Sequence, residues 1–221
     1  MSELTFADPH ERDDLGAFVA RAVRLEGDSV VRLRARGGNN DGTYSDGGDL
    51  IDAWVATPFD VLATRTVRGS MSPQDVTVAG NELLAALAIV RGETVDPGLP
   101  RDLMWRSALP PGQGWQVIDQ LPAEVVSSLA DRGLTVARDN PGPHGTPPAS
   151  LLDQTVLTVS SEGMEIKVPL RCLFAMSGMG FIGSEGPDEQ VRVTATDSWL
   201  RIDAKFGAVV RRRHALLPLL V

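Results

Sequence analysis

Apolar residues recur with helical spacing near the start of the chain. Residues 10–25 carry Leu15 and Phe18 within a series of apolar positions three and four apart, which marks one face of a helix. Asp8 suits the capping position before it, and Pro9 suits the first helical position. The pattern predicts an amphipathic helix that begins at Pro9.

Strict alternation follows, which is typical of half-buried strands. In VVRLRAR (30–36) apolar and arginine side chains take opposite faces. Residues 37–49 are nearly all turn formers and predict a hairpin loop. The rest of this half predicts three strands and one apolar helix, at 50–57, 60–67, 75–79 and 81–90.

The second half repeats the mixture of helices and strands. Residues 92–114 are rich in Gly and Pro, and around 103–109 they predict a short helix packed on the body. A helix opens at Pro122 and is expected to end at Gly133. Strands are predicted at 153–160, 164–169, 191–197, 199–206 and 208–213, and an apolar helix at 170–178.

Two segment pairs suggest an internal duplication. LIDAWVAT (50–57) resembles LLDQTVLT (151–158), and VTVAGNELLAAL (76–87) resembles IKVPLRCLFAM (166–176). The alternative is that two α+β layers arrived independently at common patterns.

The expected fold class is α+β, with antiparallel sheet layers and helices packed on one face. Two similar halves, 1–98 and 99–221, share one core. The residues expected in that core are Leu15, Phe18, Val31, Leu33, Val55, Leu84, Leu87, Val126, Leu129, Val156, Phe174 and Val193.

The composition narrows the class of protein. The 221 residues carry a formal charge of −8, which disfavours general polyanion binding but leaves room for a local basic patch. One cysteine excludes an intramolecular disulfide, and the polar, acidic start does not resemble a secretory signal. Because no apolar run approaches the ~18 residues of a membrane span, a soluble cytoplasmic protein is expected.

The sequence GMGFIG (178–183) matches the glycine spacing of dinucleotide-binding loops, but its flanking segments do not match. That loop needs a strand before it and a helix after it, whereas here an apolar helix precedes and an acidic loop follows. The context instead predicts a helix end, with Gly178 or Gly180 in the left-handed conformation and Phe181 and Ile182 in the core.

No other motif indicates catalysis, a metal or a cofactor, and none is expected. The oxygen-rich loop 39–49 lacks the spacing of a calcium loop, and the three histidines lie far apart. Cys172 is expected to be a buried core thiol. Asp52 and Asp153 fall at matching places in the suspected repeats. They are open to two interpretations, an acid–base pair or, as favoured here, two local bonds to backbone amides.

The arginines offer a candidate binding face. Arg32, Arg34 and Arg36 share one face of their strand and, together with Arg211 and Arg213, are the candidate residues for nucleic acid. The favoured alternative pairs these arginines with acids on adjacent strands, where each cross-strand pair contributes ~0.2–1 kcal/mol. The apolar tail ALLPLLV (215–221) predicts packing on the body or on a partner, such as a second copy.

Several segments resemble known families. GWQVIDQLPAEVV, LLDQTVLTV, LRCLFAMSGMGFIG and WLRIDAKFGAVV with its final RRRH look like a family of actinobacterial proteins of unknown function, and this resemblance implies no chemistry. The first helix with VVRLRAR, LIDAWVATPFDVLATRTV and DVTVAGNELLAAL is similar in pattern to one module of a bacterial DNA sliding clamp. Such modules set helices on the DNA-facing side of an antiparallel sheet, but a clamp ring needs more modules than 221 residues supply.

Together these features predict a non-catalytic binding or assembly protein. The first alternative is a clamp-like protein that binds nucleic acid through a basic sheet face. The second is an enzyme whose site is assembled from scattered residues.

Overall fold

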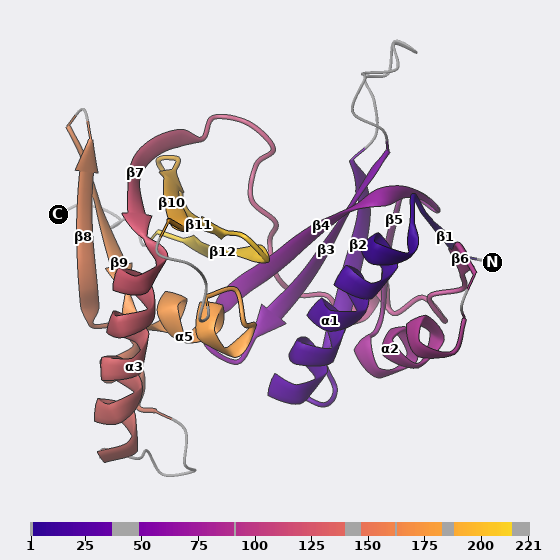
Figure 1. Ribbon diagram of the computed structural model, residues 1–221, viewed down its shortest axis with the longest axis horizontal. Helices are drawn as coiled ribbons and strands as arrows, with labels where there is room; N and C mark the ends of the chain where they lie inside the picture. The colour runs from indigo at the N-terminus through magenta and orange to yellow at the C-terminus, as the bar shows by residue number, and fades with distance from the viewer. Residues whose placement is uncertain are drawn as a thin grey trace, which may run out of the picture. The chain divides into compact units, whose positions relative to one another are not determined.

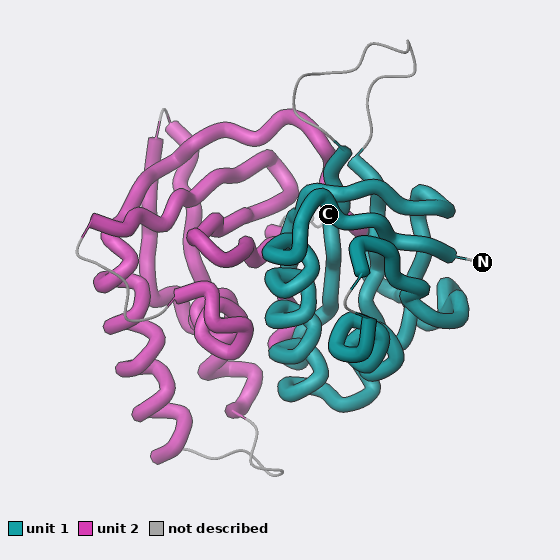
Figure 2. Tube along the Cα trace, turned by 45° about the vertical axis from the view of Figure 1, so that its right-hand side comes forward, with its two compact units in different colours: residues 1–58, 62–108 teal, residues 59–61, 109–221 magenta. Residues whose placement is uncertain are grey.

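The computed structural model divides into two compact units, which Figure 2 shows in teal and magenta. Unit 1 comprises residues 1–58 and 62–108, and unit 2 comprises 59–61 and 109–221. A boundary between the two halves after residue 98 stays a prediction. In the structure, the main segment of unit 1 ends at Ala108 and the main segment of unit 2 begins at Leu109. The structure describes residues 2–36, 49–90, 92–139, 147–161, 163–182 and 188–213.

Unit 1 combines an antiparallel sheet with two helices. Its central strands run in the order β5-β2-β3-β4, and β1 pairs antiparallel with both β4 and β6. Helices α1 and α2 lie side by side on the strands (Figure 1). The elements are β1 (Glu3–Phe6), α1 (Pro9–Leu25), β2 (Val30–Arg36), β3 (Leu50–Thr57), β4 (Val61–Ser72), β5 (Asp75–Ala79), α2 (Gly80–Ile89), β6 (Thr94–Val95) and the 3₁₀ turn η1 (Asp102–Met104).

Helix α1 starts where its capping residue predicts. Asp8 Oδ1 accepts hydrogen bonds from the backbone N–H groups of His10 at 2.8 Å and Glu11 at 3.1 Å, and Pro9 opens the helix. Leu15 and Phe18 then enter the core. The cap satisfies two amides that have no partner inside the helix, so the predicted start is confirmed.

Unit 2 contains a four-stranded antiparallel sheet and a separate hairpin. The sheet order is β12-β11-β10-β7, and β8 pairs with β9. Helix α3 packs beside α5 (Figure 1). The elements are β7 (Gln116–Pro122), α3 (Ala123–Asp139), α4 (Ala149–Leu152), β8 (Thr155–Ser161), β9 (Met164–Pro169), α5 (Leu170–Gly178), β10 (Gln190–Ala195), β11 (Trp199–Ala204) and β12 (Gly207–Arg212).

Gly133 does not end a helix, and that prediction was wrong. Helix α3 continues through it to Asp139. A Cβ atom at position 133 would lie 2.3 Å from Leu170 Cδ1, closer than two carbon atoms can approach. Gly133 therefore lets α3 pack closely against the first residue of α5, at the cost of a weaker helix former in the interior.

The end of α5 confirms the interpretation of GMGFIG. Gly180 has φ +61°, in the left-handed region, and its N–H donates to Ser177 O at 2.9 Å. The Phe181 N–H donates to Met176 O at 2.9 Å, and Phe181 and Ile182 are buried. These two bonds are those of a Schellman cap. Gly180 therefore ends helix α5, whereas the glycines of a dinucleotide-binding loop precede a helix.

The predicted core is largely confirmed. All twelve residues are buried except Leu84, Leu129 and Val156, which are half-buried. In α2 it is Leu83, not Leu84, that is fully enclosed. The region after residue 100 was predicted wrongly: only three residues form a 3₁₀ turn, and Leu103 is 96% exposed.

The two units share an order of elements. Each begins with a strand that leads into a 17-residue helix, β1–α1 and β7–α3. Each has a second strand-to-helix step, β5–α2 and β9–α5, and these steps are the matched segments 76–87 and 166–176. The other matched pair differs in secondary structure: residues 50–57 form strand β3, whereas residues 151–152 lie in α4 and strand β8 begins at Thr155.

The α+β class with antiparallel sheets is confirmed, and the repeated order of elements supports duplication. Strands β1, β6 and β7 were not predicted. The loop expected at 37–49 lies outside the described residues except for Asp49. Among the helices that the structure describes, none is long and apolar enough to span a membrane.

Candidate functional site

The three arginines of β2 meet carboxylates on the neighbouring strands. Arg32 forms a two-pronged pair with Asp75, with Nε–Oδ1 and Nη2–Oδ2 distances of 2.8 Å, and Arg34 Nε lies 3.2 Å from the same carboxylate. Arg36 forms a second two-pronged pair, with Asp52, at 2.9 and 2.6 Å. The hydrogen bonds that Arg32 donates to Asp75 raise the pKa of Arg32.

This row is thus a charge-paired sheet surface. Arg32 also lies over the Trp105 ring, 5.9 Å from its centre, which orients the guanidinium further. The Arg34 and Arg36 side chains remain about half exposed, and exposed pairs of this kind stabilise by about 0–1 kcal/mol. As a binding face for nucleic acid, Arg32, Arg34 and Arg36 remain a prediction.

Asp52 and Asp153 are not bonded to local backbone amides, so that interpretation was wrong. Asp52 accepts from Arg36 and from the Thr66 hydroxyl at 2.6 Å. Asp153 accepts from Arg171 Nε at 3.0 Å and Nη2 at 2.7 Å. Each aspartate sits in its own unit and holds an arginine there, an arrangement suited to structure more than to proton transfer.

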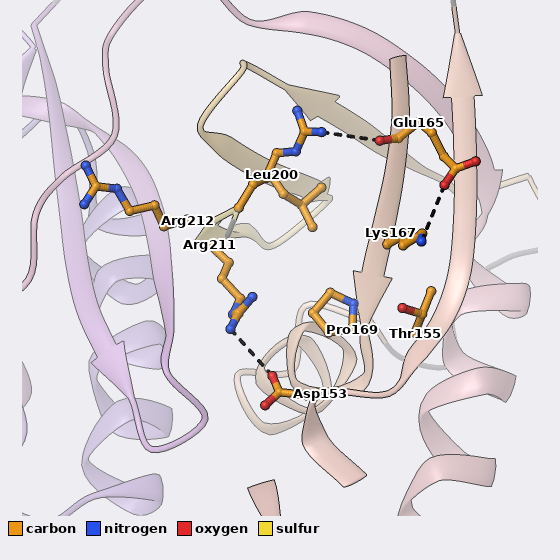
Figure 3. Close-up of a pocket in the computed structure, with 9 residues that line it drawn as sticks. Asp153, Thr155, Glu165, Lys167, Pro169, Leu200, Arg211 and Arg212 are labelled. Atoms are coloured by element: carbon orange, nitrogen blue, oxygen red, sulfur yellow. Dashed lines mark hydrogen bonds and ion pairs between the residues drawn. The ribbon is translucent and has the colours of Figure 1, made fainter. Parts of the chain in front are cut away.

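Unit 2 contains a cavity of about 370 Å³ between the β8–β9 hairpin and strands β11 and β12 (Figure 3). Both predicted arginines of this unit contribute to its wall. The lining residues are Asp153, Thr155, Glu165, Lys167, Pro169, Leu200, Arg211, Arg212 and Arg213. We call it the basic pocket, because its lining residues include four basic residues and two acidic ones.

Arg211 enters the basic pocket beside a cluster of ion pairs. Its Nη2 lies 3.7 Å from Asp153 and 3.5 Å from Asp60, with only 10% of its side chain exposed. Arg171, at 8%, holds Asp153 and also donates to Phe59 O at 2.8 Å. Arg171 and Arg211 are nearly buried, whereas the two carboxylates reach solvent. The two arginine charges are thus compensated by Asp153 and Asp60, and the cost of removing these carboxylates from water is only partly incurred.

The next two arginines separate, as alternation along a strand requires. Arg213 donates to Thr196 O at 2.9 Å and to Glu165 O at 3.3 Å, which joins the β10–β11 turn to β9. Arg212 points away from the other residues in Figure 3 and lies 5.7 Å from the Trp199 ring centre. The pocket therefore receives Arg211 from β12 and Arg213 from directly after the strand.

Lys167 was missed as a candidate. It lies across β9 from the core and pairs loosely with Glu165, with an Nζ–Oε1 distance of 3.8 Å and both side chains mostly exposed. The alternation in MEIKVP already places Glu165 and Lys167 on the polar face. Their position opposite β12 depends on contacts between distant segments and has no local signal.

Cys172 is a core thiol, as expected. Burial raises its pKa to about 12, and the nearby charges of Arg211 and Arg171 lower it by less. A thiol in this state is not a nucleophile at neutral pH.

Across the described residues, no group of three or more His, Cys, Asp and Glu side chains could hold a metal ion. The candidate ligands Asn39, Asn40, Asp41 and Asp46, as well as His144 and His214, lie outside those residues.

Comparison with protein families divides the chain almost where the structure does. Residues 1–107 match the family described as Domain of unknown function (DUF8010), and residues 110–216 match Domain of unknown function (DUF8185). Each half of the chain is thus similar to a family whose function is unknown. No curated protein matches it.

Solved structures reveal a likeness of fold. Caulobacter crescentus pol III beta has a TM-score of 0.56 at 12% identity, over 95% of this chain and 65% of its own. The DNA polymerase sliding clamp of Bacillus subtilis has a TM-score of 0.55 at 11% identity, over 99% of this chain and 66% of its own. That of Pseudomonas aeruginosa has a TM-score of 0.54 at 10% identity, with 99% and 66% covered.

This chain therefore has a sliding-clamp-like fold. The order of predicted helices and strands in its first half had already indicated a resemblance to one clamp module. It spans just under two thirds of the length of these clamp chains. Identities this low establish the fold alone.

Proposed function

We propose that this chain is a non-catalytic binding or assembly protein built on a clamp-like fold. The observation that carries the proposal is the extent of the likeness, 95–99% of the chain, so that both units contribute to it. The matched proteins are described as DNA polymerase sliding clamps and as pol III beta. A fold by itself assigns no activity, so the contact site is argued from the residues of this chain.

The basic pocket supports this proposal as the contact site for a partner protein. Its volume lies at the lower end of the range for ligand sites, enough for one or two side chains of a partner. Leu200 and Pro169 supply apolar wall, while Lys167, Arg211 and Arg213 supply cationic donors. Such a site favours an anionic group carried by a partner segment.

Site-specific crosslinking tests this proposal. A photo-reactive amino acid in place of Thr155, on the pocket wall, is expected to capture a defined partner in cells of the source organism. Lys167→Glu reverses a pocket charge and should abolish the crosslink. The matched control is Lys205→Glu at the only other lysine of the chain, outside the pocket wall. Equal capture by both variants, or no capture, would contradict a pocket-dependent partner.

Nucleic-acid binding is the second candidate, favoured by the clamp-like fold and by the Arg32, Arg34 and Arg36 row. Asp75 and Asp52 compete with phosphate for these side chains. If the row binds DNA, affinity should fall steeply with salt, and the double variant Arg32→Ala, Arg34→Ala should reduce that slope by about two. Absence of binding at ~50 mM salt, where phosphate contacts are strongest, rules this candidate out.

We also propose that residues 215–221 contribute to self-association or to a protein contact. The support is their apolar sequence, ALLPLLV, since they lie outside the described residues. Light scattering on the full chain and on a chain that ends at Arg213 tests this. An unchanged mass together with an unchanged melting temperature would remove the tail from the proposal.

A further inference from the structure

We infer that unit 1 carries a docking surface for a second copy of this chain, centred on Leu103 and Met104. The same surface of both copies takes part, so the pair is a two-fold dimer. This inference rests on the proposed function, because it names a surface through which an assembly protein would associate. Its support is an exposed apolar segment, the hydrogen bonds that hold this segment and the charges beside it.

Three large apolar side chains of unit 1 lie exposed within six residues of one another. Leu103 is 96% exposed, Leu99 69% and Met104 57%. Single exposed apolar residues are normal on protein surfaces, whereas several close together are typical of a contact surface. Methionine adds an unbranched side chain that adapts to the shape it meets. We call Leu99, Leu103 and Met104 the apolar ledge.

Hydrogen bonds to β5 hold the apolar ledge in place. The Arg101 N–H donates to Thr77 O at 2.6 Å, and the Thr77 N–H donates to Asp102 Oδ1 at 2.7 Å. The Met104 N–H donates to Arg101 O at 2.8 Å and closes the turn. Leu103 is therefore presented from an ordered turn, and an ordered surface loses little conformational entropy when a partner arrives.

The same bonds exclude one way of docking. In the part of unit 1 that the structure describes, β5 is the outer strand of the order β5-β2-β3-β4, and an outer strand can pair with a strand of another chain. Here both backbone groups of Thr77, at the centre of β5, are already bonded to Arg101 and Asp102. A second chain therefore meets the side chains of the apolar ledge and not this edge of the sheet.

The charges beside the apolar ledge favour a second copy as its occupant. Arg101 pairs with Glu82 at 3.2 Å, and their side chains are 48% and 40% exposed. Asp102 and Arg106 are exposed on the same segment. A surface that carries both signs can complement its own copy, because arginines of one copy can meet carboxylates of the other. A surface of a single sign would repel its copy.

The net charge of the chain predicts how this contact responds to salt. A formal charge of −8 makes two copies repel each other at long range. The attraction must then come from burial of the apolar ledge, which salt does not screen. Dimers should therefore become stronger as salt screens the repulsion between the copies.

Sedimentation of the full-length protein over a wide range of concentration tests the inference. Leu103→Glu should weaken the dimer by about a hundredfold, because two buried leucines are lost per dimer, with an unchanged melting temperature. The matched control is Ile89→Glu, at a 79% exposed apolar residue of α2 that lies about 10 Å along the helix from Glu82. A natural chain that stays monomeric, or an equal loss in both variants, overturns the inference.

Cysteine substitution tests the two-fold arrangement. In Leu103→Cys the two new thiols of a dimer lie opposite each other, and oxidised glutathione should convert them to a disulfide between the copies as it is itself reduced. Cys172 is buried and does not compete. Ile89→Cys, the matched control, should stay without a crosslink under the same conditions. Equal crosslinking at both positions contradicts docking at the apolar ledge.

A chain that ends at Arg213 separates this inference from the proposed function. Dimers that depend on Leu103, with or without the tail, support the apolar ledge. Dimers that depend on the tail but not on Leu103 overturn it and leave the tail proposal standing. If the natural chain is monomeric while crosslinks from position 155 still depend on Lys167, the inference falls and partner binding at the basic pocket stands. If dimers depend on Leu103 and no such crosslink forms, the reverse holds.

Discussion

Strand β2 carries three arginines, strand β12 carries two with a third directly after it, and the two groups are used in different ways. On β2 the arginines alternate with apolar residues, share one face, and meet Asp75 and Asp52 on the adjacent strands. At the end of β12 the residues Arg211, Arg212 and Arg213 are consecutive, so their side chains separate between an ion cluster, an aromatic ring and two backbone carbonyls. Spacing along a strand thus decides which face an arginine takes, and the neighbours then decide its role.

Burial is the second difference between these regions. The paired side chains on β2 are 29–54% exposed, whereas Arg171 and Arg211 in unit 2 are 8% and 10% exposed. An exposed pair is screened by water and salt, while a buried guanidinium without its partners leaves unsatisfied groups behind. Substitution of an arginine should therefore change the free energy of unfolding much more in this part of unit 2 than on β2.

The largest effect is expected from Arg171→Met. The change removes the hydrogen bonds to Asp153 and to Phe59 O, and Phe59 O then lacks that donor. We expect a loss of about 3 kcal/mol in the free energy of unfolding, at the lower end for a buried pair because Asp153 and Asp60 still reach solvent. Urea denaturation of the full chain measures it, with the exposed Arg192→Met as control. A loss below about 1 kcal/mol would place this cluster with the exposed pairs of β2.

The pH dependence of stability tests the burial of the same region through Cys172. Its pKa is raised in the folded state to about 12, so the contribution of the protonated thiol is complete below the unfolded pKa of about 8.5. That contribution is lost as pH rises from there toward 12. Between pH 8 and pH 10 the natural chain should lose about 2 kcal/mol more than Cys172→Ala does. Parallel pH profiles for the two proteins would show that water reaches the thiol.

The smallest effect is expected at the β2 row, from Asp75→Asn. It removes the carboxylate shared by Arg32 and Arg34, yet the side chains are open to water, so we expect a loss of only about 0.5–1 kcal/mol. Denaturation at low and high salt measures it, because the natural chain should lose most of this difference when its charges are screened. A loss above about 2 kcal/mol would mean that the row stabilises its unit about as strongly as the partly buried pair of Arg171 with Asp153 does.

Local patterns predicted the parts of the fold that local chemistry determines. The Asp8 cap, the alternation of β2 and the Gly180 helix end each depend on a few neighbouring residues. Predictions failed where the outcome depends on distant contacts: Leu103 has an apolar side chain but is exposed, and most residues of the edge strand β7 lie outside the core.

The candidate site was predicted only in part. Arg211 and Arg213 were identified as basic residues of a strand, and both line the pocket. Their companions Asp153, Lys167 and Leu200 come from segments far apart in sequence, whose meeting depends on how β8–β9 packs near β11 and β12. The pairing of Arg171 with Asp153 is likewise tertiary, because a helix residue must reach back to the end of α4.

The contact between Gly133 and Leu170 makes two distant positions depend on each other during evolution. Alanine at 133 would strengthen α3 by up to about 1 kcal/mol as a helix, but only if Leu170 moves away from the place where a Cβ must go. A smaller residue at 170 removes the obstacle but leaves a gap as long as 133 is glycine. Each change is costly alone and acceptable with the other, so related chains should show the two substitutions together.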